Sequence, residues 1–189
     1  MNILKLYKTK KTVFTIADLR KILDTSNEGT IRNYLSRAKE KGLLENVYYG
    51  IWKIVDRDVD VFEFACKLNK NSYISFETVL KKHGIIFQYS GQTVFMASDK
   101  SLEKTALGFT FKSIKLKNSI LLNPLGVEYI GNYAIASQER AICDRLYISS
   151  DYYFDNLENV DFVKLREIST IYNKRVIQEV SNLIEKYAR

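Results

Sequence analysis

Polar and basic side chains gather in residues 28–41, a segment whose apolar residues repeat at the spacing of an α-helix. The inward set is Ile31, Tyr34, Leu35 and Ala38; the outward set is Thr30, Asn33, Arg37 and Glu40, flanked by Arg32, Ser36, Lys39 and Lys41. Cationic side chains bind phosphates, while amides and hydroxyls bond to base edges in the major groove. The segment therefore has the chemistry of a helix that reads DNA.

The elements around this segment would position it for that task. A helix over 16–23, with Thr15 placed to cap its N-terminus, precedes it after a short polar turn. This is the spacing of a helix-turn-helix. Strands at 43–47 and 51–55, with Gly50 at the bend, predict a hairpin directly afterwards. Two helices followed by such a hairpin predict a winged helix-turn-helix.

The distribution of charge favours the same interpretation. The chain has a net charge of +7, and residues 1–53 hold eleven cations against five anions, or +6. A basic segment attached to a nearly neutral remainder is typical of modules that bind polyanions, because each neutralised phosphate releases counterions. Charge carries no sequence information, so ordinary solvated lysines remain an alternative explanation.

From these patterns we predict that double-stranded DNA is the partner. The predicted contact residues lie in the turn, the second helix and the hairpin: Ser26, Asn27, Thr30, Arg32, Asn33, Ser36, Arg37, Lys39, Lys41, Tyr48, Tyr49 and Lys53. We expect Asn33 to sit against base edges, since it is short and lies in the middle of the helix. Arg37 is longer, and we expect it to hold a phosphate.

Other residues could do chemistry, but their patterns favour structural roles. His83 is the one histidine, and it stands where a helix is expected to end, without a nucleophile motif beside it. Asp56, Asp58 and Asp60 alternate, yet the glycine and terminal glutamate of a calcium loop are missing, so we expect a solvated linker. We therefore predict no catalytic residue, no metal site and no cofactor.

A second group of charges lies in the stretch 136–147. Glu139, Arg140, Asp144 and Arg145 fall at helical spacing, with Arg140 and Asp144 four residues apart. Such i to i+4 pairs on a helix surface stabilise it by about 0.3–0.5 kcal/mol. We expect ordinary surface ion pairs there.

Composition places the chain among ordinary globular proteins. Its 189 residues are 46% hydrophobic and 27% charged. It has no apolar run of about 18 residues and no apolar core of a secretory signal at its start, so we expect a soluble, cytoplasmic protein without a membrane segment. Its two cysteines, Cys66 and Cys143, both lie in helical contexts, which excludes a disulfide framework and a Cys/His zinc site.

The rest of the chain predicts a second lobe of the α+β class. Strands are expected at 92–97, 108–116, 120–122 and 126–136, in a mostly antiparallel sheet, and a long C-terminal helix at 162–187. We place the domain boundary in the charged stretch 56–60, which gives a DNA-binding domain at 1–57 and a regulatory domain at 58–189.

The order of these segments resembles the AbiEi family, the antitoxins and transcriptional regulators of type IV toxin-antitoxin systems. The matching stretches are Phe14–Thr15 with the two helices, Lys41–Leu44, Tyr49–Trp52, Ser72–Ile86 and Ala136–Tyr147. The resemblance implies that the protein represses its own operon at repeated operator sequences. It further implies that the second lobe opposes a nucleotidyltransferase toxin. Tyr49 departs from the family pattern, which commonly has a basic residue before the wing glycine.

Two other functions stay open at this point. The first is a nuclease or transferase whose winged helix only delivers the substrate; the absence of a Glu-x-Lys tripeptide and of a phosphate-binding loop counts against it. The second is a protein interaction module that uses a winged fold. The salt dependence of duplex binding would separate a DNA-binding protein from such a module.

Overall fold

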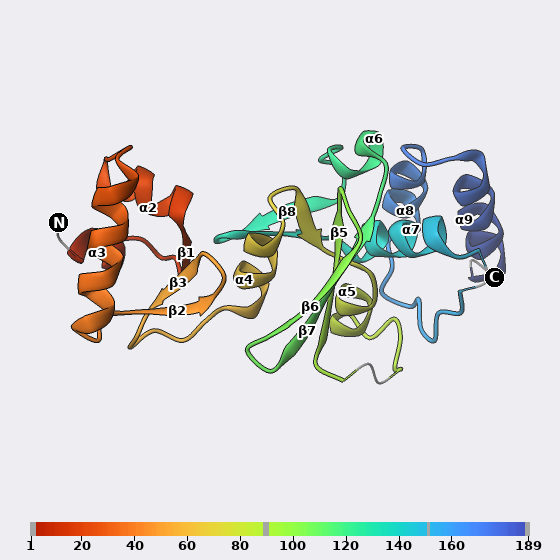
Figure 1. The fold of residues 1–189 in the computed structure, drawn as a ribbon. Helices are drawn as coiled ribbons and strands as arrows, with labels where there is room; N and C mark the ends of the chain where they lie inside the picture. The colour runs from red at the N-terminus through yellow and green to blue at the C-terminus, as the bar shows by residue number, and fades with distance from the viewer. Residues whose placement is uncertain (1–2, 89–90, 151, 188–189) are drawn as a thin grey trace. The chain divides into compact units, whose positions relative to one another are not determined.

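The computed structural model describes residues 3–88, 91–150 and 152–187 (Figure 1). It has a mixed α+β fold and divides into two compact units, which we call unit 1 (residues 1–68) and unit 2 (residues 69–189). The expected α+β class is confirmed.

Unit 1 contains four helices and three strands among its described residues. In chain order they are α1 (Leu4–Tyr7), β1 (Val13–Thr15), α2 (Ile16–Leu23), α3 (Glu28–Glu40), β2 (Leu44–Tyr48), β3 (Ile51–Ile54) and α4 (Val61–Leu68). The strands form one antiparallel sheet in the order β1-β3-β2. Sequence analysis did not predict β1, whose three residues pair with the outer edge of the hairpin.

Local signals in the sequence explain where α2 and α3 begin. Thr15 caps α2, because its hydroxyl accepts a hydrogen bond from the Asp18 amide (3.1 Å), and the Asp18 carboxylate accepts one from the Thr15 amide (3.0 Å). The Asn27 side chain caps α3 by accepting from the Thr30 amide (3.0 Å). Both helices therefore begin where the sequence predicted.

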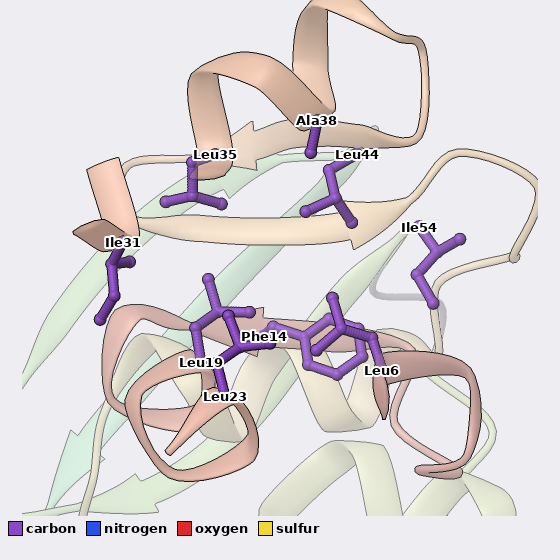
Figure 2. Close-up of a cluster of buried hydrophobic side chains, with 9 residues drawn as sticks. All are labelled: Leu6, Phe14, Leu19, Leu23, Ile31, Leu35, Ala38, Leu44 and Ile54. Atoms are coloured by element: carbon purple, nitrogen blue, oxygen red, sulfur yellow. The ribbon is translucent and has the colours of Figure 1, made fainter. Parts of the chain in front are cut away.

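Figure 2 shows the core of unit 1, into which α3 inserts Ile31, Leu35 and Ala38. These side chains meet residues of α1, β1, α2 and the hairpin. The cluster consists of Leu6, Phe14, Leu19, Leu23, Ile31, Leu35, Ala38, Leu44 and Ile54. Because one face of α3 is buried in this cluster, its other face is exposed.

The charged stretch 56–60 is not the linker that the sequence predicted. The Tyr7 hydroxyl donates to the Asp56 carboxylate (2.8 Å), and the Arg57 guanidinium donates to the Thr9 carbonyl (3.0 Å). Asp60 accepts from the Phe62 amide (2.8 Å) at the start of α4. The stretch belongs to unit 1, since its side chains bond back to the N-terminal residues.

Helix α4 also belongs to unit 1, so the unit ends at residue 68 and not at the expected residue 57. Glu63 is buried and accepts from the amide and hydroxyl of Thr12, both at 2.8 Å. Lys67 forms an ion pair with Asp18 (3.2 Å). These are contacts between residues about fifty positions apart, which helical periodicity does not reveal.

Unit 2 packs helices against a six-stranded mixed sheet. Its elements are β4 (Ser72–Ile74), α5 (Phe76–Lys82), β5 (Thr93–Ser98), β6 (Leu102–Ala106), β7 (Phe109–Lys115), α6 (Asn118–Leu121), β8 (Val127–Ile130), β9 (Tyr133–Ala136), α7 (Gln138–Ile148), α8 (Phe162–Ser169) and α9 (Lys174–Tyr187). The strand order is β6-β7-β5-β4-β9-β8, with β5/β7 and β4/β9 parallel and the other three pairings antiparallel.

Three expectations for unit 2 need correction. Residues 120–122 do not form a strand, because 118–121 are the short helix α6. Residues 126–136 form a hairpin of two strands rather than one strand. The expected helix at 162–187 is two helices, because Tyr172 turns into the core and the Asn173 side chain caps a new helix by accepting from the Val176 amide (3.0 Å).

Candidate nucleic-acid interface

The outward face of α3 is exposed along its whole length. Thr30, Asn33 and Arg37 lie on this face, opposite the residues that α3 buries. Glu40 lies there too and accepts a hydrogen bond from the Ser36 hydroxyl (3.0 Å). The face therefore offers an amide, a hydroxyl and a guanidinium, together with one carboxylate.

One flank of α3 borders an open hollow of about 730 Å³, which we call the hairpin-side hollow. Arg32 and Lys39 line it from α3, and Tyr49 and Trp52 line it from the β2–β3 hairpin. Ser36 completes the helical side. The α3 side of the hollow thus carries two cations beside the Glu28 carboxylate, and the hairpin side carries two aromatic rings.

The other flank borders a second hollow of about 700 Å³, which we call the α1-side hollow. Thr30, Asn33, Arg37 and Lys41 line it along α3 and its C-cap. Ile3, before α1, also lines it. Polar and cationic groups therefore border α3 on both flanks.

The cations of α3 differ from four other cations of unit 1, which pair with acidic side chains. Within the described residues, Arg32, Arg37 and Lys39 form no ion pair. In contrast, Lys11 and Lys67 both pair with Asp18, and Lys53 pairs with Glu45 (3.6 Å); Arg20 pairs with Glu28. The charges on α3 are available to a ligand without first breaking an internal interaction.

The structure brings eight of the predicted contact residues to the two hollows. They are Thr30, Arg32, Asn33, Ser36, Arg37, Lys39, Lys41 and Tyr49. The remaining four lie elsewhere. Ser26 is exposed in the turn, Asn27 caps α3, and Lys53 pairs with Glu45; Tyr48 directs its ring at Phe64 of α4, edge-on at 6.0 Å.

The predicted contact residues do not include Asn46 and Trp52, which line the hairpin-side hollow from the two strands of the hairpin. The two pair across the hairpin, so they lie side by side on one face of the sheet. The alternation of side chains along the two strands could have indicated them, had the register of the hairpin been known.

Unit 2 contains a group of charges whose expected position was wrong. Arg140 and Asp144 are 0% exposed rather than on the surface. The Asp144 carboxylate accepts from the hydroxyls of Ser75 (2.6 Å), Tyr172 (2.6 Å) and Tyr73 (3.0 Å). Ser75, the residue before α5, makes no side-chain cap hydrogen bond to that helix, because its hydroxyl bonds to Asp144.

The Arg140 guanidinium is equally well satisfied. It donates to the carbonyls of Ile120 and Leu125, both at 2.7 Å, and to the Tyr73 hydroxyl (2.9 Å). Burial raises the pKa of the Asp144 carboxyl, and the charge of Arg140 acts in the opposite sense. These polar groups have all their partners inside unit 2. The cluster therefore joins residues 73–75, 120–125, 140–144 and 172 to one another, and its groups are not free to bind a ligand.

The other candidate groups fall into no common site. His83 is exposed at the C-terminal end of α5. In the part of the chain that the structure describes, no three His, Cys, Asp or Glu side chains lie close enough to share a metal ion. No helix among the described residues is long and apolar enough to cross a membrane.

Comparison with known proteins supports the fold. No protein-family model matches the sequence, and no curated protein is significantly similar to it. The chain is similar to the crystal structure of the RV2827C protein from Mycobacterium tuberculosis, with a TM-score of 0.53 and 10% sequence identity. The match covers 97% of this chain and 74% of that protein. At this identity the likeness shows a shared mixed α+β fold.

Proposed function

We propose that the protein is a DNA-binding transcriptional regulator, and that unit 1 is its winged helix-turn-helix. In this proposal α2 and α3 are the helix-turn-helix, α3 enters the major groove, and the β2–β3 hairpin is the wing. The observation that carries the proposal is the row of unpaired cations along both flanks of an exposed helix. A groove of DNA presents phosphates on both sides of an inserted helix, so cations on both flanks fit it.

The two hollows suggest how the contacts divide. Arg32 and Lys39 would hold the phosphates of one strand on the hairpin side, and Arg37 and Lys41 would hold those of the other strand. Asn33 lines the α1-side hollow beside Arg37 and would reach base edges. The α3 helix has 13 residues, which makes it about 20 Å long, enough to span several base pairs in the groove.

The net charges of the two units support DNA binding by unit 1 only in part. Residues 1–68 hold thirteen cations and nine anions, or +4, and residues 69–189 hold +3. The acidic side chains of 54–68 lower the total of unit 1, but they lie in the stretch that bonds to the N-terminal residues and in α4. The local charge on α3 supports DNA binding better than the charge of the whole unit does.

For unit 2 we propose the antitoxin role that the AbiEi resemblance implies, with a nucleotidyltransferase toxin as partner. The resemblance of segments 72–86 and 136–147 is its support. Coexpression tests it: the full chain should relieve the growth arrest caused by a nucleotidyltransferase encoded beside its gene. A chromosomal neighbourhood without such a gene would leave the DNA-binding role standing and would contradict the antitoxin role.

Selection from randomised duplexes with the full chain tests DNA binding. We expect enrichment of a defined sequence and an affinity that falls steeply with salt concentration. The matched variants are a triple change of Arg32, Arg37 and Lys39 to Ala, which should abolish binding, and a triple change of Lys81, Lys82 and Lys100 in unit 2, which should not. Equal binding by both variants would contradict the proposal.

A further inference from the structure

Tyr49 stands at the tip of the β2–β3 hairpin with 95% of its surface exposed. The adjacent Tyr48 points the other way and packs edge-on against Phe64 of α4. Tyr48 therefore packs the hairpin against α4, whereas Tyr49 is exposed to solvent. Tyr49 also lines the hairpin-side hollow, across from Arg32 and Lys39 of α3.

The tip is held in a defined shape. The Asn46 side-chain amide donates to the carbonyls of Tyr48 (2.9 Å) and Ile51 (3.1 Å), so it bridges the two strands directly below the turn. Gly50 follows Tyr49 with φ +72°, in the left-handed region that favours glycine. A contact residue held in place before binding loses less entropy when it binds.

The tip carries no cation of its own to offer a phosphate. The turn residues are Tyr49 and Gly50, and the Lys53 ammonium of β3 is paired with Glu45 (3.6 Å). The strand residues on either side of the turn, Tyr48 and Ile51, are uncharged as well. A tip of this kind can contact DNA through an aromatic ring and one hydroxyl, but not through charge.

We propose that Tyr49 is a specificity-determining contact that enters the minor groove beside the major groove occupied by α3. The inference rests on the proposed function. The ring would lie along the apolar sugar walls, and the hydroxyl would donate to the acceptors on the groove floor, adenine N3 or thymine O2. The amino group of guanine projects from that floor and obstructs the approach of the hydroxyl to these acceptors, so the contact favours A·T over G·C pairs at the position under the wing.

The test uses the full chain and the duplex enriched from a random pool. Tyr49→Ala should weaken binding about tenfold, the loss of one aromatic contact to DNA, while the slope of affinity against salt stays unchanged. Tyr49→Phe keeps the ring and should retain most of the affinity, but should lose the preference for A·T under the wing. Tyr129→Ala is the matched control, since Tyr129 is 85% exposed in unit 2, and it should bind like the unchanged protein.

Three results would overturn the inference. Full affinity of Tyr49→Ala would remove Tyr49 from the interface while leaving DNA binding intact. A salt slope lowered by Tyr49→Ala would make the wing a phosphate contact instead. Equal A·T preference in Tyr49→Phe and the unchanged protein would exclude the hydroxyl. If the unchanged protein enriches no duplex, the proposed function itself fails. Unfolding midpoints of all variants should agree, because Tyr49 and Tyr129 are exposed.

Discussion

Helices α3 and α7 each carry arginines at helical spacing beside acidic residues. In α3, Arg32 and Arg37 are exposed and unpaired within the described residues. In α7, Arg140 is 0% exposed and donates to two carbonyls and to a tyrosine hydroxyl. The difference teaches that an arginine is available for a ligand only where the fold has not already used its donors.

The physical cost of the two arrangements also differs. An exposed guanidinium keeps its hydration, so removing it changes stability little. A buried guanidinium has exchanged water for fixed partners, so removing it leaves the buried Asp144 carboxyl without its cation. Replacing the buried arginine of α7 should therefore lower stability much more than replacing an arginine of α3. Replacing an arginine of α3 should lower DNA affinity much more than replacing the one in α7.

The largest expected effect is that of Arg140→Met. We expect it to lower the free energy of unfolding of unit 2 by about 3–5 kcal/mol, because it leaves a buried carboxylate without its cation. Urea unfolding of the full chain, followed by circular dichroism, measures this. Arg37→Met is the control and should stay within about 0.5 kcal/mol of the unchanged protein.

A double change sharpens this result. Replacing Asp144 by Leu together with Arg140→Met removes both charges, and it should recover part of the lost stability. Loss of stability from Arg37→Met equal to that from Arg140→Met would break the comparison between α3 and α7.

The next effect in size concerns Asn33. We expect Asn33→Ala to weaken binding to the selected duplex by about 1–3 kcal/mol and to leave binding to random DNA nearly unchanged, because base contacts carry the sequence preference. Fluorescence anisotropy with both duplexes at one salt concentration measures it. Equal losses on the two duplexes would remove Asn33 from the residues that read bases.

Arg37→Ala should have a smaller and less selective effect. Since we assign it a phosphate contact, both duplexes should weaken alike and the salt slope should fall by about 1. The control is Arg145→Ala in α7, where the guanidinium pairs with Glu77 (3.0 Å); the salt slope should stay the same. A change confined to the selected duplex would show that Arg37 contacts a base.

The smallest effect involves Asp18, which is neither fully exposed nor fully buried. Burial raises the pKa of its carboxyl, but hydrogen bonds from Thr15 and the charges of Lys67 and Lys11 outweigh burial, so the pKa lies below its usual value. The interactions that lower this pKa stabilise the fold while the carboxyl is ionised. Their contribution is lost as the pH falls through the pKa of the folded state.

We therefore expect Asp18→Asn to lower the free energy of unfolding by about 1 kcal/mol at pH 7. The difference from the unchanged protein should become smaller as the pH falls below about 4. Unfolding in urea at pH 7 and at pH 3 gives the comparison. Asp58→Asn, an exposed acid in the same unit, should leave both values unchanged. A constant difference between Asp18→Asn and the unchanged protein at the two pH values would exclude ionisation as the cause.

The helices of unit 1 could be predicted because their signals are local. The Thr15 capping box and the repeat of Ile31, Leu35 and Ala38 each act within about one or two turns of helix. The same residues imply the exposed face of α3, and eight predicted contact residues indeed line its two hollows. Their role in binding DNA stays a prediction.

The predictions were wrong where the structure depends on contacts between residues far apart in the sequence. Nothing in the spacing of Arg140 and Asp144 distinguishes a buried pair from a surface pair, because Tyr73 and Tyr172 are 67 and 28 residues away from their partners. The division of 162–187 into two helices depends on the same network, since Tyr172 reaches Asp144 from the break between them.

The sequence by itself determined where α2 and α3 begin, which face of α3 is apolar, and that the opposite face is polar and basic. These follow from periodicity and from hydrogen bonds between neighbouring residues. Only the tertiary structure decided that Tyr49 is displayed while Tyr48 is packed, that α4 belongs to unit 1, and that Arg140 is buried. Burial and pairing of a side chain depend on what the chain brings from far away, and no local pattern encodes that.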